Sequence, residues 1–125
     1  HAFFDSLFEP GVTLPNGTTI RLVTPACFLV TKLTAFGDRG RRHPIASHDL
    51  EDVIAVIDGR EEITADVTAA PANLRAAIAE MLEGLLALPD AEDVIAAQLL
   101  PDAKSQDRLP FVLDRIGQLI AAGRN

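Results

Sequence analysis

From residue 24 onward, apolar residues recur at helical spacing, and prolines, glycines and capping residues mark where each run begins and ends. Such spacing places apolar side chains on one face of a helix, which must pack against other helices to leave water. The longest run spans 71–88 and stops at Pro89. The pattern predicts a bundle of about six helices over 24–125. The stripe of the longest helix should comprise Leu74, Ile78, Met81 or Leu82, Leu85 and Leu86.

Capping residues define two of these helices closely. Thr24-Pro25 predicts a helix start, and Gly37 predicts its end, because Thr caps, Pro suits the first position and Gly suits the terminus. Ser47 caps a second helix, and acids in its first turns match the helix dipole. Residues 38–46 are predicted as a polar loop between the two. The last helix is predicted to begin within 106–109. Its inner face should carry Phe111, Val112, Ile116, Leu119 and Ile120.

The first 23 residues follow a different pattern. Residues 2–8 resemble a short apolar helix, and Asn16-Gly17 then separates two short runs rich in β-branched residues. Asn-Gly between such runs is a strong signal for a β-hairpin. The expected fold class is α+β, mainly a helical bundle with an N-terminal β-hairpin. We assign 1–125 to one domain or fragment, with the short helix and hairpin in 1–23 and the helical region in 24–125.

The start of the chain predicts a larger protein and self-association. The sequence opens with His1, not Met, and three Phe lie within 2–8. We therefore expect the chain to be part of a longer fold whose missing portion covers these residues. Left uncovered, this apolar surface should pair two copies, and a symmetric dimer is the commonest closed assembly. The contact should include Phe3, Phe4, Leu7, Phe8, Val12, Leu14, Ile20 and Leu22.

Composition excludes several classes of protein. The net charge of −7 argues against non-specific binding of nucleic acid by the whole surface. A single cysteine, Cys27, excludes a disulfide within the chain and fits a reducing cytoplasm. No apolar run approaches the ~18 residues that a membrane-spanning helix needs. We expect a cytoplasmic protein that does not contact a membrane.

Lys32 is the residue that most suggests a specific site. If residues 25–37 are helical, its neighbours one turn away are all apolar: Phe28, Leu29, Ala35 and Phe36. A charge at such a position is costly unless it is paired or reaches a cleft. Lys32 therefore has either a fixed structural partner or an anionic ligand, and the sequence leaves both open.

Two further groups of charged residues follow Lys32. Arg39, Arg41 and Arg42 form a basic stretch that suits phosphate, or simply a solvated loop. Asp49 and Asp52 lie three residues apart on the next helix and point to one side. Paired carboxylates can bind a metal or transfer protons, but acids are also common at helix N-termini.

Taken together, these residues resemble the C-terminal half of nucleotidyltransferases of the AbiEii/AbiGii type. In that family one helix carries K-x-x-A-x-x-x-R, which Lys32, Ala35 and Arg39 match. The following helix opens with a polar residue and D-x-x-D before an apolar residue, which Asp49, Asp52 and Val53 match. The similarity extends to the hairpin L-P-N-G-T-T-I-R-L and is most specific over 12–59.

The resemblance implies transfer of a nucleoside monophosphate from an NTP to an acceptor such as RNA. It implies catalytic roles for Lys32 and Asp49 and substrate binding by Arg39, Arg41 and Asp52. The partners would be the NTP, its acceptor and, for members that act as toxins, an antitoxin. In the family, Mg²⁺ is held by an Asp-x-Asp after a Gly-Gly or Gly-Ser turn, and neither motif occurs in this sequence.

Two interpretations follow from that departure. The chain is expected to be the C-terminal portion of a nucleotidyltransferase, inactive alone and without a metal site of its own. The alternative is a non-catalytic helical module for interaction or dimerisation, built on the same core.

Overall fold

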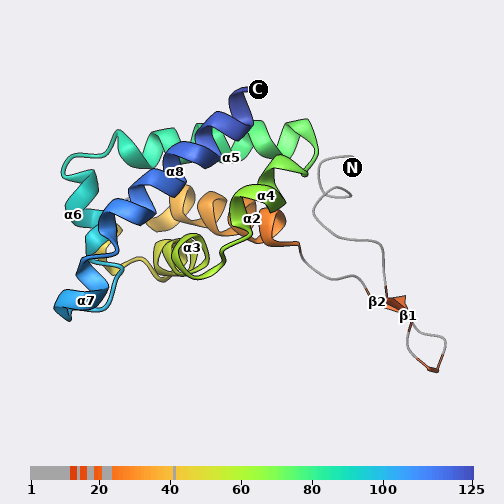
Figure 1. Ribbon diagram of the computed structural model, residues 1–125, viewed down its shortest axis with the longest axis horizontal. Coiled ribbons are helices and arrows are strands. Elements are labelled where there is room, and N and C mark those ends of the chain that lie inside the picture. The colour runs from red at the N-terminus through yellow and green to blue at the C-terminus, as the bar shows by residue number, and fades with distance from the viewer. Residues whose placement is uncertain (1–11, 14, 17–18, 21–23, 41) are drawn as a thin grey trace.

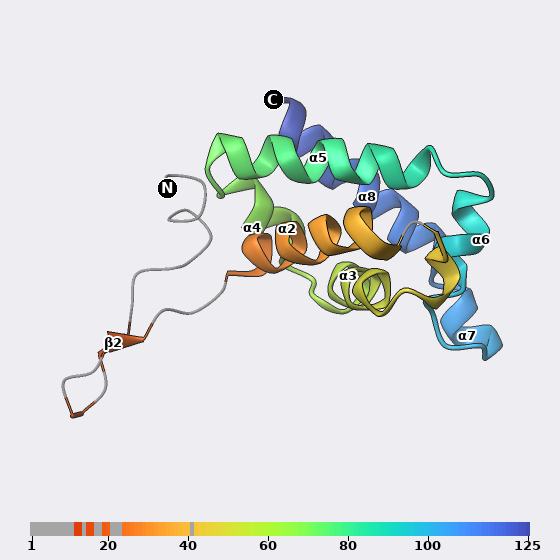
Figure 2. The same cartoon turned by 180° about the vertical axis from the view of Figure 1, so that it is seen from behind.

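A computed structural model describes residues 12–13, 15–16, 19–20, 24–40 and 42–125. Strands β1 (Val12–Thr13) and β2 (Thr19–Ile20) pair antiparallel, with Val12 opposite Ile20. Figures 1 and 2 draw this pair apart from the helices. The remainder of the predicted hairpin and the whole 2–8 segment lie outside the described residues. The predicted self-association through these segments therefore stays a prediction.

Helix α2 (Pro25–Ala35) begins as predicted, since the Thr24 hydroxyl accepts a hydrogen bond from the backbone N–H of Cys27 at 3.1 Å. Its predicted end at Gly37 is wrong. The helix continues as a π-helical turn, η1 (Phe36–Gly40). The continuation buries Phe36 and Gly40 against the start of the next long helix, and this packing outweighs the tendency of Gly37 to end a helix.

Helix α3 (His48–Gly59) follows a short 3₁₀ turn, η2 (Pro44–Ala46). The predicted cap is confirmed, because the Ser47 hydroxyl accepts from the Leu50 N–H at 3.2 Å. Residues 38–46, predicted as a loop, therefore contain parts of η1 and all of η2. The C-terminal end of α3 is held from a distance, since Arg115 donates to the carbonyl oxygens of Ile57 and Asp58.

Five further helices complete the bundle, and all but the short α7 were expected from the sequence. They are α4 (Ile63–Thr68), α5 (Ala72–Leu86), α6 (Ala91–Ala96), α7 (Ala103–Gln106) and α8 (Leu109–Arg124). The prediction of a mainly helical bundle is confirmed. No helix among the described residues is long and apolar enough to cross a membrane.

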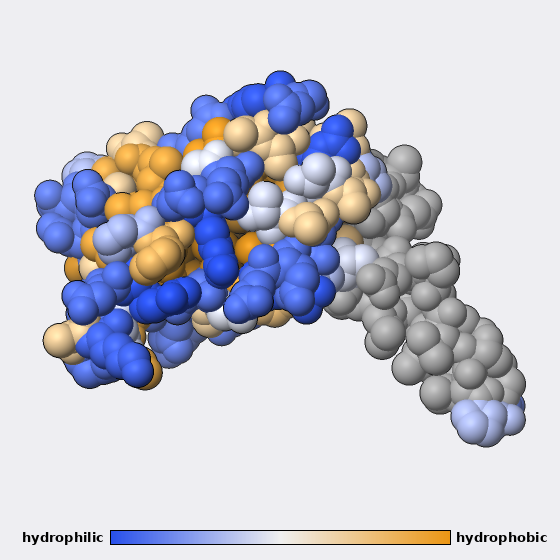
Figure 3. Space-filling model, in the orientation of Figure 1, coloured by the Kyte–Doolittle hydropathy of each residue, from blue (hydrophilic) through white to orange (hydrophobic). Residues whose placement is uncertain are grey.

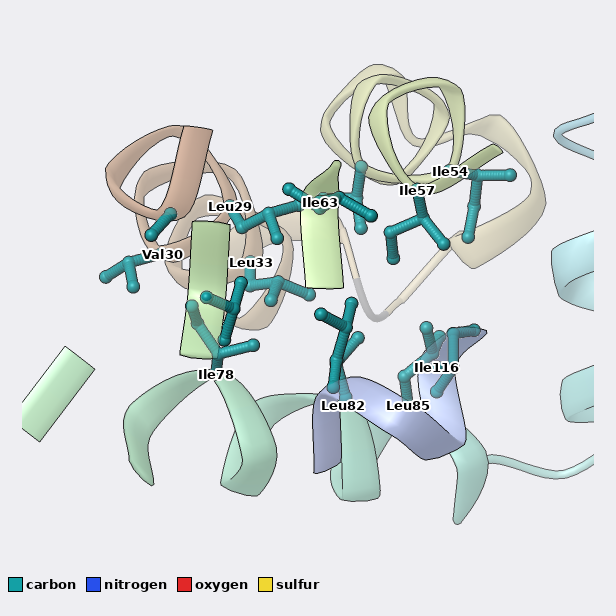
Figure 4. Packing of buried hydrophobic residues seen from close by; sticks show 14 of the residues in the cluster. Leu29, Val30, Leu33, Ile54, Ile57, Ile63, Ile78, Leu82, Leu85 and Ile116 are labelled. Atoms are coloured by element: carbon teal, nitrogen blue, oxygen red, sulfur yellow. The ribbon is translucent and has the colours of Figure 1, made fainter. Parts of the chain in front are cut away.

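The core lies between two pairs of helices. Helices α5 and α8 cross and pack along most of their length, and α2 packs on both α3 and α5 (Figures 1 and 2). Figure 4 shows side chains from these helices meeting in one cluster. Residues with no exposed surface include Leu29, Leu50, Ile54, Ile57, Ile78, Leu82, Ile116 and Leu119. Cys27 is also fully buried, which confirms its predicted place in the core.

Two residues of the predicted inner faces point outward. Leu86 is 40% exposed at the end of α5, and Phe111 is 60% exposed in the first turn of α8. Both lie at helix ends, where no neighbouring helix covers the continuing stripe. The Phe111 ring instead stacks near the Arg108 guanidinium, 4.9 Å from the ring centroid. Figure 3 shows apolar patches between hydrophilic side chains on the face of the helical bundle seen in Figure 1.

Candidate functional site

Lys32 lies at the margin of the buried face of α2. Leu29 and Phe36, one turn away on either side, are buried, whereas Phe28 and Ala35 are half-buried. The Lys32 side chain is 29% exposed. Its stem therefore covers apolar surface while its ammonium group reaches the boundary with solvent.

The two acids predicted on one side of α3 both face Lys32. The Lys32 Nζ lies 2.8 Å from Asp52 Oδ2 and 3.7 Å from Asp49 Oδ1. The Ser47 cap fixes where α3 begins and so places both carboxylates in its first two turns opposite α2. Of the two alternatives for Lys32, the fixed structural partner is present.

Arg39 joins the same cluster from the π turn. Its Nε lies 3.4 Å from Asp49 Oδ2, so Asp49 stands between two cations. Seven residues separate Arg39 from Lys32, which returns a side chain to nearly the same side of a helix. The Arg39 side chain is 74% exposed, whereas that of Asp49 is only 14% exposed. We name Lys32, Arg39, Asp49 and Asp52 the charged cluster.

A hollow of about 490 Å³ opens beside the charged cluster, where η1 and η2 meet the start of α3. Its lining includes Arg39, His43, His48 and Asp49. Arg42 and both histidines are exposed. Arg41, predicted to bind substrate, lies outside the described residues, so its position stays a prediction. The hollow gives a ligand access to one side of the cluster.

The surroundings of Lys32 stabilise its charged form. The hydrogen bond to Asp52, with the negative charges of Asp52 and Asp49, raises the pKa of Lys32 above its ordinary value. Partial desolvation and the charge of Arg39 oppose this shift without reversing it. The Phe28 ring adds a weak attraction, since its centroid is 5.7 Å from Nζ. Lys32 is thus a permanent cation at neutral pH.

Replacing Lys32 by Met should lower the melting temperature at pH 7, because Asp49 and Asp52 lose their shared counter-charge. The pH dependence has a defined sign. Folding raises the pKa of Lys32, so its stabilisation is complete below the ordinary lysine pKa of about 10.4 and is lost as pH rises through the folded value. In thermal melts from pH 7 to pH 11, the difference between the two melting temperatures should therefore stay constant at first and shrink toward the alkaline end.

Lys104 provides the matched control. It is the other lysine of the chain and is exposed, so Lys104→Met should melt close to wild type throughout. If Lys32→Met melts at or above the wild-type temperature at pH 7, apolar contacts along α2 contribute more to stability at residue 32 than the ion pairs do.

Comparison of the chain with protein-family models, curated proteins and solved structures returns no match. The chemistry of the charged cluster therefore rests on its own geometry. Two cations and two carboxylates give it a net charge of about zero, so each charge already has an opposite neighbour. Arg39 and Asp52 are nevertheless exposed enough to exchange these partners for a ligand.

Mg²⁺, which the resemblance implies for the whole enzyme, does not fit this cluster. Asp49 and Asp52 face the Lys32 ammonium, whose charge repels a cation from the place between them. Across residues 24–40 and 42–125, and the few described before them, no three His, Cys, Asp or Glu side chains are grouped to bind a metal. No step of the chemistry considered below involves a metal on these residues.

The sequence identified the charged groups and the Ser47 cap that positions Asp49 and Asp52, but not the role of Gly40 beside Arg39. Gly40 is buried between Phe36 and Ser47, yet it was indistinguishable from Gly37 as one of two glycines in a polar stretch. The sequence did contain one signal for a longer helix. Lys32 and Arg39 are seven residues apart, and this spacing places both side chains on one side of the helix only if the helix continues beyond Gly37.

Proposed function

We propose that this chain is the C-terminal portion of a nucleotidyltransferase that transfers a nucleoside monophosphate from an NTP to an acceptor such as RNA. Lys32 contacts the NTP phosphates as a point charge. Asp49 orients Lys32 or the acceptor, and Arg39 and Asp52 contact the substrate, together with Arg41. The residues that bind Mg²⁺ belong to another part of the enzyme, so this chain alone transfers no nucleotide.

The observation that carries the proposal is the convergence of three segments on one point. Lys32 from α2, Arg39 from η1 and Asp49 with Asp52 from α3 lie within ion-pair distance. These are the residues that the resemblance selects from the sequence. An ordinary stabilising ion pair requires only two of them, whereas the cluster adds an exposed arginine and an open hollow beside it.

Lys32 can bind a phosphate while keeping its partner on α3. An ammonium group has three N–H donors, and Asp52 accepts one of them at close range. Asp49, at 3.7 Å, is beyond a short hydrogen bond and can yield to a phosphate oxygen. The 29% exposed surface of the side chain leaves a path for that oxygen.

The π turn η1, which follows α2 and contains Arg39, supports the same proposal. π-helical turns are rare and frequently lie at functional sites, although most of them lie inside α-helices and this one follows the end of α2. Here η1 extends α2 by five residues and carries Arg39 to Asp49.

Titration with ATP, CTP, GTP or UTP tests the proposal. We expect amide chemical shifts to change around Lys32, Arg39 and Asp49, with weak affinity, about 1 mM, because the cluster is neutral and the chain carries −7. Affinity should increase at low salt. Lys32→Met should weaken binding about tenfold, since a charge-assisted contact to phosphate is lost.

Lys104→Met controls for loss of charge alone and should bind like wild type. Binding that Lys32→Met leaves unchanged, or shifts confined to other basic residues, would overturn the proposal. So would transfer of label from an NTP to total tRNA by this chain alone, since the proposed Mg²⁺-binding acids lie elsewhere.

A non-catalytic interaction module is the second candidate. Its support is the large apolar side chains exposed among the described residues: Ile45, Leu100 and Phe111, each at least 60% accessible. A second copy of the chain, or an antitoxin where the enzyme acts as a toxin, would cover such residues. Sedimentation in the micromolar range separates the candidates, since a module that dimerises through α8 should become monomeric on Phe111→Ser without change in nucleotide binding.

A further inference from the structure

Gly40 is the last residue of the π turn, and its surroundings leave no room for a side chain. It is buried, with the Phe36 ring on one side and the Ser47 hydroxyl on the other. A Cβ atom added there would lie 2.5 Å from Phe36 Cδ1 and 2.7 Å from Ser47 Oγ. Both distances are far below van der Waals contact. A residue with a side chain therefore cannot occupy this place unless Phe36 shifts within the π turn and Ser47 shifts at the start of α3.

Neither neighbour of Gly40 can easily give way. Phe36 is only 3% exposed, so its ring has little room within the core. The Ser47 hydroxyl caps α3 by accepting from Leu50, and a change of its rotamer would abandon that bond. Gly37, in the same turn, differs entirely, since a Cβ there would meet nothing within 4 Å.

The close contact between Gly40 and Ser47 lies next to both members of the Arg39–Asp49 ion pair. Arg39 precedes Gly40 by one residue, and Asp49 follows Ser47 by two. The approach of Gly40 to Ser47 therefore fixes how far the Arg39 backbone stands from the start of α3. The Arg39 Nε reaches Asp49 Oδ2 at 3.4 Å, so a small separation of the two segments breaks this pair.

We infer that Gly40 is a positioning residue that holds Arg39 against Asp49 and so shapes the ligand-facing side of the charged cluster. The role in ligand binding rests on the proposed function, whereas the effect on the ion pair does not. Lys32 and Asp52 pair at 2.8 Å, and neither is among the atoms nearest to an added Gly40 Cβ, so we expect this pair to be less sensitive to Gly40.

The test compares Gly40→Ala with Gly37→Ala in the full 125-residue chain. Alanine favours a helix over glycine at either position, so any loss of stability at Gly40 reports the collision. The spectroscopic readout is the Arg39 Nε–Hε signal, which should exchange slowly in wild type and Gly37→Ala and rapidly in Gly40→Ala. The Lys32 signal, one of only two lysine signals, should titrate as in wild type in all three proteins.

ATP titration gives the functional readout. Gly40→Ala should raise the Kd about threefold to tenfold, and Arg39→Ala should raise it equally, with no further effect of Gly40→Ala in the Arg39→Ala background. If wild type binds no nucleotide, the proposed function fails, and the Arg39 signal alone decides the role of Gly40. An Arg39 signal unchanged in folded Gly40→Ala would overturn the inference.

Wild-type amide exchange covers the case in which Gly40→Ala does not fold. A fixed contact with Ser47 predicts slow exchange at the Gly40 amide, comparable to that of neighbouring turns of α2. Exchange as fast as that of an unstructured peptide would refute the positioning role whatever the variant does.

Discussion

Leu82→Ala should destabilise the protein by about 2–5 kcal/mol, because it opens a cavity where α5 meets its neighbours. Leu82 has no exposed surface and lies in the middle of the core cluster (Figure 4). A domain of this size has a total stability of about 5–15 kcal/mol, so the loss is a large fraction of it. A denaturant titration should give a lower midpoint with an unchanged slope.

Leu86→Ala is the matched control on the same helix. Leu86 lies one turn later and is 40% exposed, so the same truncation should cost less than about 1 kcal/mol. Equal losses at Leu82 and Leu86 would mean that α5 does not form the centre of the core.

Gly123→Ala should destabilise by about 1–3 kcal/mol, because α8 crosses α5 at this glycine without space for a methyl group. An added Cβ would lie 2.5 Å from the Cβ of Ala79 and would also collide with the carbonyl oxygen of Arg75. A backbone atom cannot move aside as a flexible side chain can. The crossing must therefore widen, which also strains the ion pair between Arg124 and Glu83.

Substitution of Gly117 by Ala should change the stability in the opposite direction. A Cβ there meets nothing within 4 Å, so Gly117→Ala should stabilise α8 by about 0.5–1 kcal/mol through helix propensity. Thermal melts of the two variants decide the matter. A rise in melting temperature for both would show that α5 and α8 do not approach closely at Gly123.

Local signals predicted the elements of the bundle well. The side-chain hydroxyls of Thr24 and Ser47 each bond to a backbone N–H within three residues, so neighbouring residues contain the whole interaction. The buried stripe of α5 likewise follows from spacing alone. The outward positions of Leu86 and Phe111 depend instead on where neighbouring helices end, which spacing within one helix does not encode.

The charged cluster was predictable in its members and not in its geometry. The position of Lys32 among apolar neighbours predicted either a structural partner or an anionic ligand, and Asp49 and Asp52 are present as partners. The pairing of Arg39 with Asp49 depends on a turn that passes through Gly37 and stops at Gly40. Two glycines three residues apart carry the same local preference, and only the distant contact with Ser47 distinguishes them.

The hydrogen bonds from α8 to the C-terminal end of α3 affect how the protein folds during its synthesis. Arg115 binds the carbonyl oxygens of Ile57 and Asp58, and Arg108 pairs with the Asp58 carboxylate, 50 residues earlier in the chain. Ribosomes add about 5–20 residues per second, so α3 leaves the exit tunnel seconds before these arginines do. During that interval α3 can pack on α2, but its C-terminal end lacks the arginines that hold it. The nascent chain thus completes the C-terminal end of α3 only after translation of α8, although all four residues of the charged cluster are made earlier.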